Sequence, residues 1–261
     1  MWPGMKFLSC GVSASRNGGL RVAAFVLVHG AWHGGWCWAQ VEDALREKGH
    51  RAFAPTLTGL GERSHLLTSK IDADLHVLDV VNVLKWAELE DVVLVGHSYG
   101  GLIVTGVAGQ VPERVRALVY LDAFVPAESG VSLFARGNPE RMARFQAEID
   151  SGAAGVQPDL FDAWAEDEAV KDWLRSMCTP QPAGTFAGGV TLTGREVEVA
   201  HRYYILCERN RPSAFWDEHD RVKGRPGWKA DRIATMHDAM VEAPDELARL
   251  LNEFVTGLTD G

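Results

Sequence analysis

The sequence predicts an α/β protein with a mostly parallel, doubly wound sheet, and two observations support this prediction. Short apolar runs rich in β-branched residues recur at Ala23–Val28, Val92–Val95 and Ala117–Leu121, as expected of strands buried on both faces. Segments in which apolar residues have helical spacing separate these runs. Such alternation is typical of parallel sheets, which bind ligands at the carboxyl ends of their strands.

The elements of the first half follow this alternation in order. After the first apolar run, a helix is predicted to extend to Lys48, and Gly49 is expected to end it. Arg51–Pro55 is a short second strand. From Asp72 to Glu88 the spacing of apolar residues suits an amphipathic helix.

The elements at the end of the chain return to the same pattern. His201–Cys207 and Trp228–Ile233 are the predicted last strands. Pro244 opens a terminal helix, because proline is well tolerated at a first helical position.

The intervening segment differs, because it contains helical stretches at about Pro139–Ile149 and Leu160–Met177 but no convincing strand. We therefore expect residues 23–126 and 201–261 to form the core and residues 127–200 to form an inserted helical cap. Residues 1–22 are expected to be a mobile leader, or to reflect an upstream start with Met5 as another candidate.

Composition narrows the possible functions. A chain of 261 residues with a formal net charge of −9 fits one large domain and argues against nucleic acid or an anionic membrane surface as partner. No segment approaches the length of a membrane span. The four cysteines have no metal-ligand spacing, so no metal is expected and the cytoplasm is the default location. They are Cys10, Cys37, Cys178 and Cys207.

The segment Gly96-His97-Ser98-Tyr99-Gly100 lies between an apolar strand and a predicted helix, which is the context of a nucleophile elbow. Ser98 would sit on a strained turn, and a Cβ at 96 or 100 would collide with the neighbouring strand or helix. The helix N-terminus supplies N–H groups where an oxyanion would form. Ser98 is the predicted nucleophile.

The remaining catalytic groups are predicted from chain order. His237 follows the last strand and precedes the last helix, where the general base is expected. The oxyanion hole should combine the N–H of Tyr99 with that of Ala31, which lies in the loop after the first strand. Gly30 would let the backbone of Ala31 approach the reacting carbonyl.

The string Val28-His29-Gly30-Ala31-Trp32-His33-Gly34-Gly35-Trp36-Cys37-Trp38, the elbow and the His237 segment together resemble the α/β-hydrolase superfamily. More narrowly, they resemble the branch that contains plant methyl esterases, hydroxynitrile lyases and related bacterial esterases. The resemblance implies a cofactor-free hydrolase with a Ser–His–acid triad.

The triad acid departs from this pattern. In the plant members it follows the strand that here ends at Cys207, and the matching position is Asn210, an amide. We favour Asp122, at the carboxyl end of the preceding strand, although it could instead cap the turn that follows. Glu208 or Asp217 could serve if the loop is shifted, or the chain could work without an acid or be a non-catalytic homologue.

The predicted activity is hydrolysis of a small carboxylic ester with an apolar or aromatic group, through an acyl-enzyme. Phe124, Phe134 and Trp164 are candidate substrate contacts, although aromatics in a cap also serve packing. Lactones, thioesters and carbamates stay open as substrates, and so does a homodimer.

Two other activities are alternatives. A hydroxynitrile lyase would carry Lys directly after the catalytic His, where this chain has Asp238, a negative group that would repel cyanide. A ligand-binding homologue without turnover is favoured only by Asn210.

Overall fold

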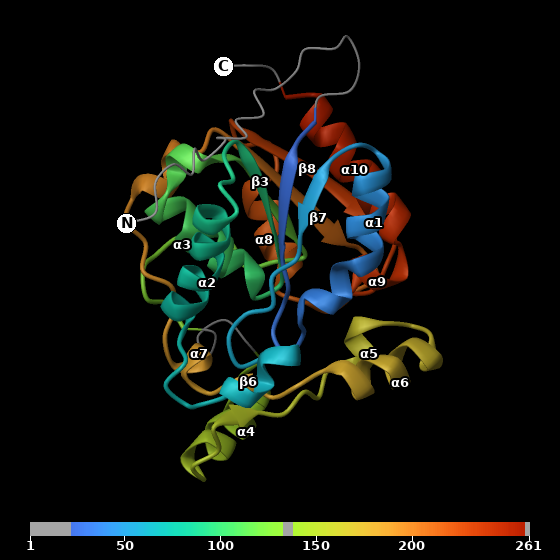
Figure 1. Cartoon of the computed structure of the whole chain (residues 1–261). Coiled ribbons are helices and arrows are strands. Elements are labelled where there is room, and N and C mark those ends of the chain that lie inside the picture. Colours follow the sequence, from blue (N-terminus) through green and yellow to red (C-terminus); the bar gives the residue numbers. More distant parts are fainter. Residues whose placement is uncertain (1–21, 133–137, 259–261) are drawn as a thin grey trace, which may run out of the picture.

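The computed structural model describes residues 22–132 and 138–258, and its centre is a six-stranded parallel sheet (Figure 1). The strand order is β2-β1-β3-β4-β7-β8, and every neighbouring pair in it is parallel. The predicted α/β fold with a parallel, doubly wound sheet is therefore confirmed. The strands are β1 (Ala24–Val28), β2 (Arg51–Phe53), β3 (Val92–His97), β4 (Val115–Leu121), β7 (His201–Cys207) and β8 (Trp228–Ile233).

Helices cover both faces of the sheet. In β3, Val93 and Val95 join the core on the side of α1 (Ala39–Glu47), α9 (Ala239–Glu242) and α10 (Pro244–Thr256). Val92 and Leu94 join the opposite core, which is covered by α2 (Ala73–Trp86), α3 (Gly100–Gln110) and α8 (Phe215–Val222). Because successive side chains of a strand point to opposite faces, one apolar run supplies both cores.

The predicted helix ends have identifiable causes. The Asp72 side chain accepts a hydrogen bond from the backbone N–H of Leu75 at 2.9 Å and so caps α2. Gly49, with φ of +84°, ends α1 in the left-handed conformation that glycine tolerates. Short 3-10 turns connect other elements: Gly35–Trp38, Gly61–Leu66, Pro112–Arg114 and Arg195–Glu198.

The strand order creates a crevice at one position. β1 pairs with β2 on one side and with β3 on the other, so the connections after β1 and β3 leave the sheet in different directions. Ligands of open parallel sheets bind at this kind of switch point. The loop from Gly30 to Gly34 and the Ser98 turn therefore flank the same opening.

Residues 139–187, between β4 and β7, lie beyond one end of the sheet (Figure 1). The predicted helix over Leu160–Met177 is in fact two helices, since the Asp167 side chain caps a new start by accepting from the N–H of Ala169. The elements of this segment are α4 (Pro139–Asp150), β5 (Gly155–Val156), α5 (Phe161–Trp164), α6 (Glu168–Met177), β6 (Gln181–Pro182) and α7 (Gly184–Ala187).

The expectation that this segment holds no strand is wrong. β5 and β6 pair antiparallel through two residues each, which is too short to leave an alternating pattern in the sequence. The predicted leader, apart from Val22, and Phe134 lie outside the described residues.

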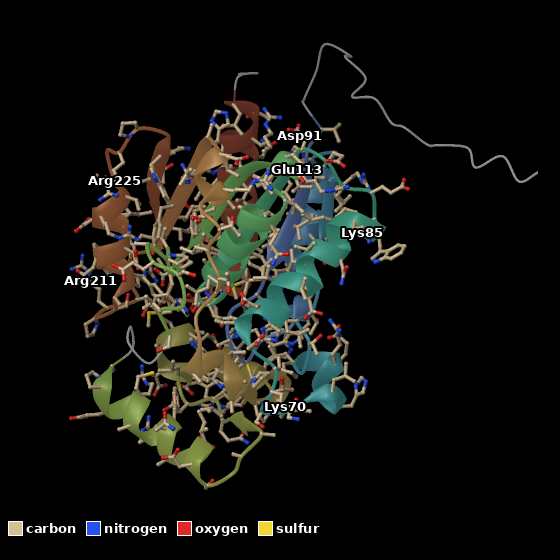
Figure 2. All side chains as sticks on the ribbon, turned by 90° about the vertical axis from the view of Figure 1, so that its left-hand side faces the viewer. Lys70, Lys85, Asp91, Glu113, Arg211 and Arg225 are labelled. Atoms are coloured by element: carbon tan, nitrogen blue, oxygen red, sulfur yellow. The ribbon has the colours of Figure 1, made fainter. Side chains whose placement is uncertain are left out.

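Many charged side chains lie on the outside of the molecule, whereas Asp122 and Asp238 are buried. Figure 2 shows Lys70, Lys85, Arg211 and Arg225 at its periphery, and all four are exposed. Among the described residues, no helix is long and apolar enough to cross a membrane.

Buried histidines hold the loops at the carboxyl edge of the sheet through hydrogen bonds to the backbone. His29 is fully buried and donates from Nδ1 to the Gly30 carbonyl, while its Nε2 accepts from the Leu57 N–H at 3.0 Å. His76 donates to the Thr58 carbonyl. Burial lowers the pKa of His29 to about 3 and lowers the pKa of His76, so both hold these loops as neutral imidazoles.

Gly96→Ala tests the close packing beneath the elbow. An added Cβ would lie 2.5 Å from the Gly100 carbonyl oxygen, which is backbone and cannot move aside cheaply. We expect a loss of about 2–3 kcal/mol of stability and a fall in melting temperature of roughly 4–10 °C. Gly188→Ala is the matched control, because no atom lies within 4 Å of its added Cβ. Equal melting of the two variants would contradict this account.

The buried neutral histidines predict loss of stability in acid. Below pH 6.5 the unfolded chain binds a proton at His29 that the folded chain excludes until about pH 3, so stability falls as pH falls through this window. One such group contributes up to about 1.4 kcal/mol per pH unit. Urea denaturation between pH 7 and 5 measures how the free energy of unfolding depends on pH. In His29→Gln this dependence should be shallower than in the wild type by about this amount. The exposed His65→Gln is the control, and an unchanged slope in His29→Gln would oppose the assignment.

Candidate active site

Ser98 occupies the turn between β3 and α3 with φ of +53°, a left-handed conformation that is strained for a serine. Its N–H donates to the Leu121 carbonyl, and its own carbonyl accepts from Gly101 and Phe124, so the strained turn is held from both sides. An added Cβ at Gly100 would lie 2.5 Å from the Val28 carbonyl oxygen. The predicted strain at Ser98 and the need for glycine at 96 and 100 are both confirmed.

His237 and Asp122 are in direct contact. His237 Nδ1 lies 2.6 Å from Asp122 Oδ2, and both side chains are buried. Asp122 directly follows β4, has φ of +41° and donates its N–H to the Ile205 carbonyl of β7. Its Oδ1 accepts from the Cys207 N–H at 3.2 Å. The carboxylate is thus fixed by the edge of the sheet and directed at His237.

Asn210 joins the same cluster. Its Nδ2 donates to Asp122 Oδ2 at 2.7 Å and lies 3.3 Å from His237 Nδ1. The other two candidate acids, Glu208 and Asp217, are exposed, and neither bonds to His237 in the part of the chain that the structure describes. The carboxylate that the fold brings to His237 is that of Asp122.

The loop after β1 places the backbone of Ala31 beside the elbow. An added Cβ at Gly30 would lie 3.1 Å from Ser98 Cβ and 2.8 Å from His97 Nδ1, so glycine permits this close approach. The backbone N–H groups of Ala31 and Tyr99 donate to no protein acceptor within residues 22–132 and 138–258. Both are therefore available to a ligand.

The segment between β4 and β7 is bonded to both loops that carry these groups. Trp32, with φ of +66°, donates from its backbone to Gln181 Oε1 and from its indole to the Val156 carbonyl. The N–H of His237 donates to the Ala163 carbonyl at 3.1 Å. These hydrogen bonds therefore hold the Ala31 loop and His237 against the same segment.

These groups line one cavity of about 250 Å³. Ser98, His237, Ala31 and Tyr99 lie on the core side, and no Asp or Glu lines the cavity among residues 22–132 and 138–258. The predicted substrate contacts Phe124 and Trp164 both line the cavity. Further aromatic residues around it are Trp32, Phe145, Phe186 and Phe215.

A second buried carboxylate–histidine pair adjoins the cavity, and sequence reasoning missed it. His33 donates from Nδ1 to the Ala31 carbonyl at 2.7 Å, and its Nε2 lies 3.0 Å from Asp238 Oδ2. Burial alone would lower the pKa of His33, but the neighbouring Asp238 carboxylate raises it above the usual value. No local spacing signals this pair, because His33 and Asp238 lie 205 residues apart in the sequence.

Asp238 does not present a free negative charge to the cavity, contrary to the expectation from its position after His237. Its side chain is fully buried, bonded to His33 and absent from the cavity lining. His97, whose Nε2 donates to the His237 carbonyl, separates the two acid–histidine pairs. Burial and then the charge of His237 hold the pKa of His97 well below its usual range.

One group of potential metal ligands occurs among the described residues: His97, His237 and Asp238, with ligand atoms within 4.8 Å of one another. His237 Nδ1 is bonded to Asp122 and Asp238 Oδ2 to His33, so these contacts describe a hydrogen-bond network.

Comparisons with known proteins identify the family of the chain. The profile of the alpha/beta hydrolase family matches residues 25–250. A carbendazim hydrolyzing esterase from Nocardioides sp. (strain SG-4G) is 42% identical over 242 residues, which cover 88% of this chain and 98% of the relative. Methyl jasmonate esterase 1 from Vitis vinifera is 35% identical over 264 residues, covering 90% and 97%.

An extracellular alpha/beta-hydrolase from a Paenibacillus species has a similar structure, with a TM-score of 0.74 at 21% identity over 89% of this chain and 98% of that one. This likeness shows the same fold. The chain belongs to the alpha/beta hydrolase family, as its sequence motifs predicted, and both relatives named above are esterases by name.

Proposed function

We propose that this carboxylesterase-type hydrolase cleaves small esters through a serine acyl-enzyme, with Ser98 as nucleophile, His237 as general base and Asp122 as triad acid. The observation that carries the proposal is the 2.6 Å contact between His237 Nδ1 and the buried Asp122 carboxylate, behind a cavity that Ser98 also lines. A serine hydroxyl is a weak nucleophile at neutral pH and needs such a base.

In the first half-reaction, Ser98 Oγ attacks the ester carbonyl carbon and its proton passes to His237 Nε2. The carbonyl oxygen becomes an oxyanion that accepts from the N–H groups of Ala31 and Tyr99. Asp122 holds the Nδ1–H tautomer and stabilises the imidazolium that forms. When the intermediate collapses, the carbon–oxygen bond to the alcohol breaks and the alcohol takes the proton from His237.

In the second half-reaction, water attacks the acyl-enzyme and gives its proton to His237. The new oxyanion uses the same two donors, and its collapse releases the carboxylic acid and returns the proton to Ser98. The strained φ of Ser98 supports this cycle because it holds the side chain at the apex of the turn.

The lining residues support a substrate with an apolar ring. The cavity is small, and Trp32, Phe124 and Trp164 are among several aromatic side chains in its walls. The names of the two relatives concern carbendazim and methyl jasmonate, compounds that carry a methyl group on a carbamate or ester oxygen. We therefore propose methyl esters or methyl carbamates of small ring systems as substrates, with methanol as the leaving alcohol.

Ser98→Ala tests the proposed nucleophile. Hydrolysis of p-nitrophenyl acetate and of carbendazim should both fall by on the order of 10⁴-fold or more, because no other group replaces the hydroxyl. Ser176→Ala, an exposed serine, is the matched control and should keep full activity. Turnover that survives in Ser98→Ala would refute the serine mechanism, and no turnover in the wild-type protein would favour a ligand-binding homologue.

Gly30→Ala tests the oxyanion donor on the first loop. The added methyl group would meet His97 and Ser98, so the loop must shift and withdraw the Ala31 N–H from the reacting carbonyl. We expect kcat to fall by about 10²-fold with a much smaller change in KM, since the donor acts mainly in the transition state. Steady-state kinetics should be measured with circular dichroism as a check of folding. A folded variant with near-normal kcat would remove Ala31 from the oxyanion hole.

A further inference from the structure

Asp122 Oδ2 accepts two hydrogen bonds from different directions. His237 Nδ1 lies at 2.6 Å and Asn210 Nδ2 at 2.7 Å, while the remaining carboxylate oxygen is occupied by the Cys207 N–H. Asn210 Nδ2 is also only 3.3 Å from His237 Nδ1. The end of the Asn210 side chain therefore lies within reach of both members of the acid–base pair.

The chemistry of these atoms fixes the role of the amide. An amide oxygen facing Asp122 would repel the carboxylate, so the NH₂ group must face it. When His237 Nδ1 carries its proton, it and Asn210 Nδ2 are both donors and cannot bond to each other. Both therefore donate to Asp122 Oδ2. The amide holds that oxygen in place, and because its NH₂ group is a donor it offers the His237 proton no alternative acceptor.

Asn210 is itself rigidly held. Its backbone N–H donates to the Cys207 carbonyl and its carbonyl accepts from the Trp216 indole, each at 3.2 Å. The residue is 6% exposed. A buried side chain anchored on both sides of its backbone can orient its partner without losing further conformational entropy.

We propose that Asn210 is a positioning residue for Asp122 and that positions 122 and 210 form an exchangeable carboxylate–amide pair. The inference rests on the proposed serine mechanism. Asp and Asn have nearly the same shape, so a carboxylate at 210 would start about 3.3 Å from His237 Nδ1. An amide at 122 would then donate to it, which is the present arrangement with the two partners reversed.

The test compares four chains: wild type, Asp122→Asn, Asn210→Asp and the double exchange Asp122→Asn/Asn210→Asp. Asp122→Asn should lower kcat for p-nitrophenyl acetate by about 10³–10⁴-fold, as loss of a triad carboxylate does. The double exchange should recover at least about 100-fold of that loss, because an acid again faces the base. If the double variant folds but is no more active than Asp122→Asn, the proposal that the two positions are exchangeable is wrong.

Asn210→Asp alone gives a readout that a structural role would not produce. Two carboxylates would lie within hydrogen-bond distance beside His237, and the added negative charge favours the imidazolium. The acid limb of the pH profile of kcat/KM should therefore move to higher pH. Asn82→Asp, an exposed substitution of the same kind, should leave the profile unchanged. Identical profiles for both variants would contradict the proposal.

Asn210→Leu tests the positioning role when an exchanged chain does not fold. It removes the donor to Asp122 while keeping a similar volume, and we expect kcat to fall about 10–100-fold with KM changed less than about threefold. If kcat falls and KM rises by the same factor, or if neither changes, Asn210 is not a positioning residue. Ser98-dependent turnover by wild type separates the two hypotheses: its absence defeats the proposed function, whereas its presence without rescue defeats only this inference.

Discussion

The contact between Asp122 Oδ2 and His237 Nδ1 is the interaction on which the proposed chemistry of this protein depends. The Asp122 carboxylate is fully buried, which would cost free energy if it had no partners. The fold supplies three hydrogen-bond donors to it. Two of these donors come from β7 and the loop after it, and the third comes from the loop after β8. The parallel register of β4, β7 and β8 therefore determines the geometry of the site.

The other half of the site depends on the topological switch in the sheet. Because the connections after β1 and β3 diverge, the Ala31 loop and the Ser98 turn can face one another across a small opening. The segment between β4 and β7 bonds to Trp32 on one side and to His237 on the other. A single segment thus orders the proposed oxyanion loop and the proposed base together, which is consistent with positions that must hold to within a fraction of an ångström.

Much of this could be predicted from the sequence, because strong local patterns coincide with the elements that matter. Buried strands leave continuous apolar runs, and the glycines at 96 and 100 indicate the tight, strained turn at Ser98. The two-residue β5–β6 pair and the break before Asp167 were missed, since such short features leave no periodicity. The partners of Asp238 and the donor role of Asn210 could not be read from spacing, because side chains 205 and 88 residues apart meet only through the sheet.

The most direct measurement of the central claim is to trap the acyl-enzyme. The protein is mixed with p-nitrophenyl acetate, quenched in acid within the first turnover, digested and analysed by mass spectrometry. The account predicts one acetyl group per chain on the peptide that contains Ser98, and none on that peptide in Ser98→Ala. Efficient turnover with no adduct at Ser98, or with the adduct on another side chain, would contradict it.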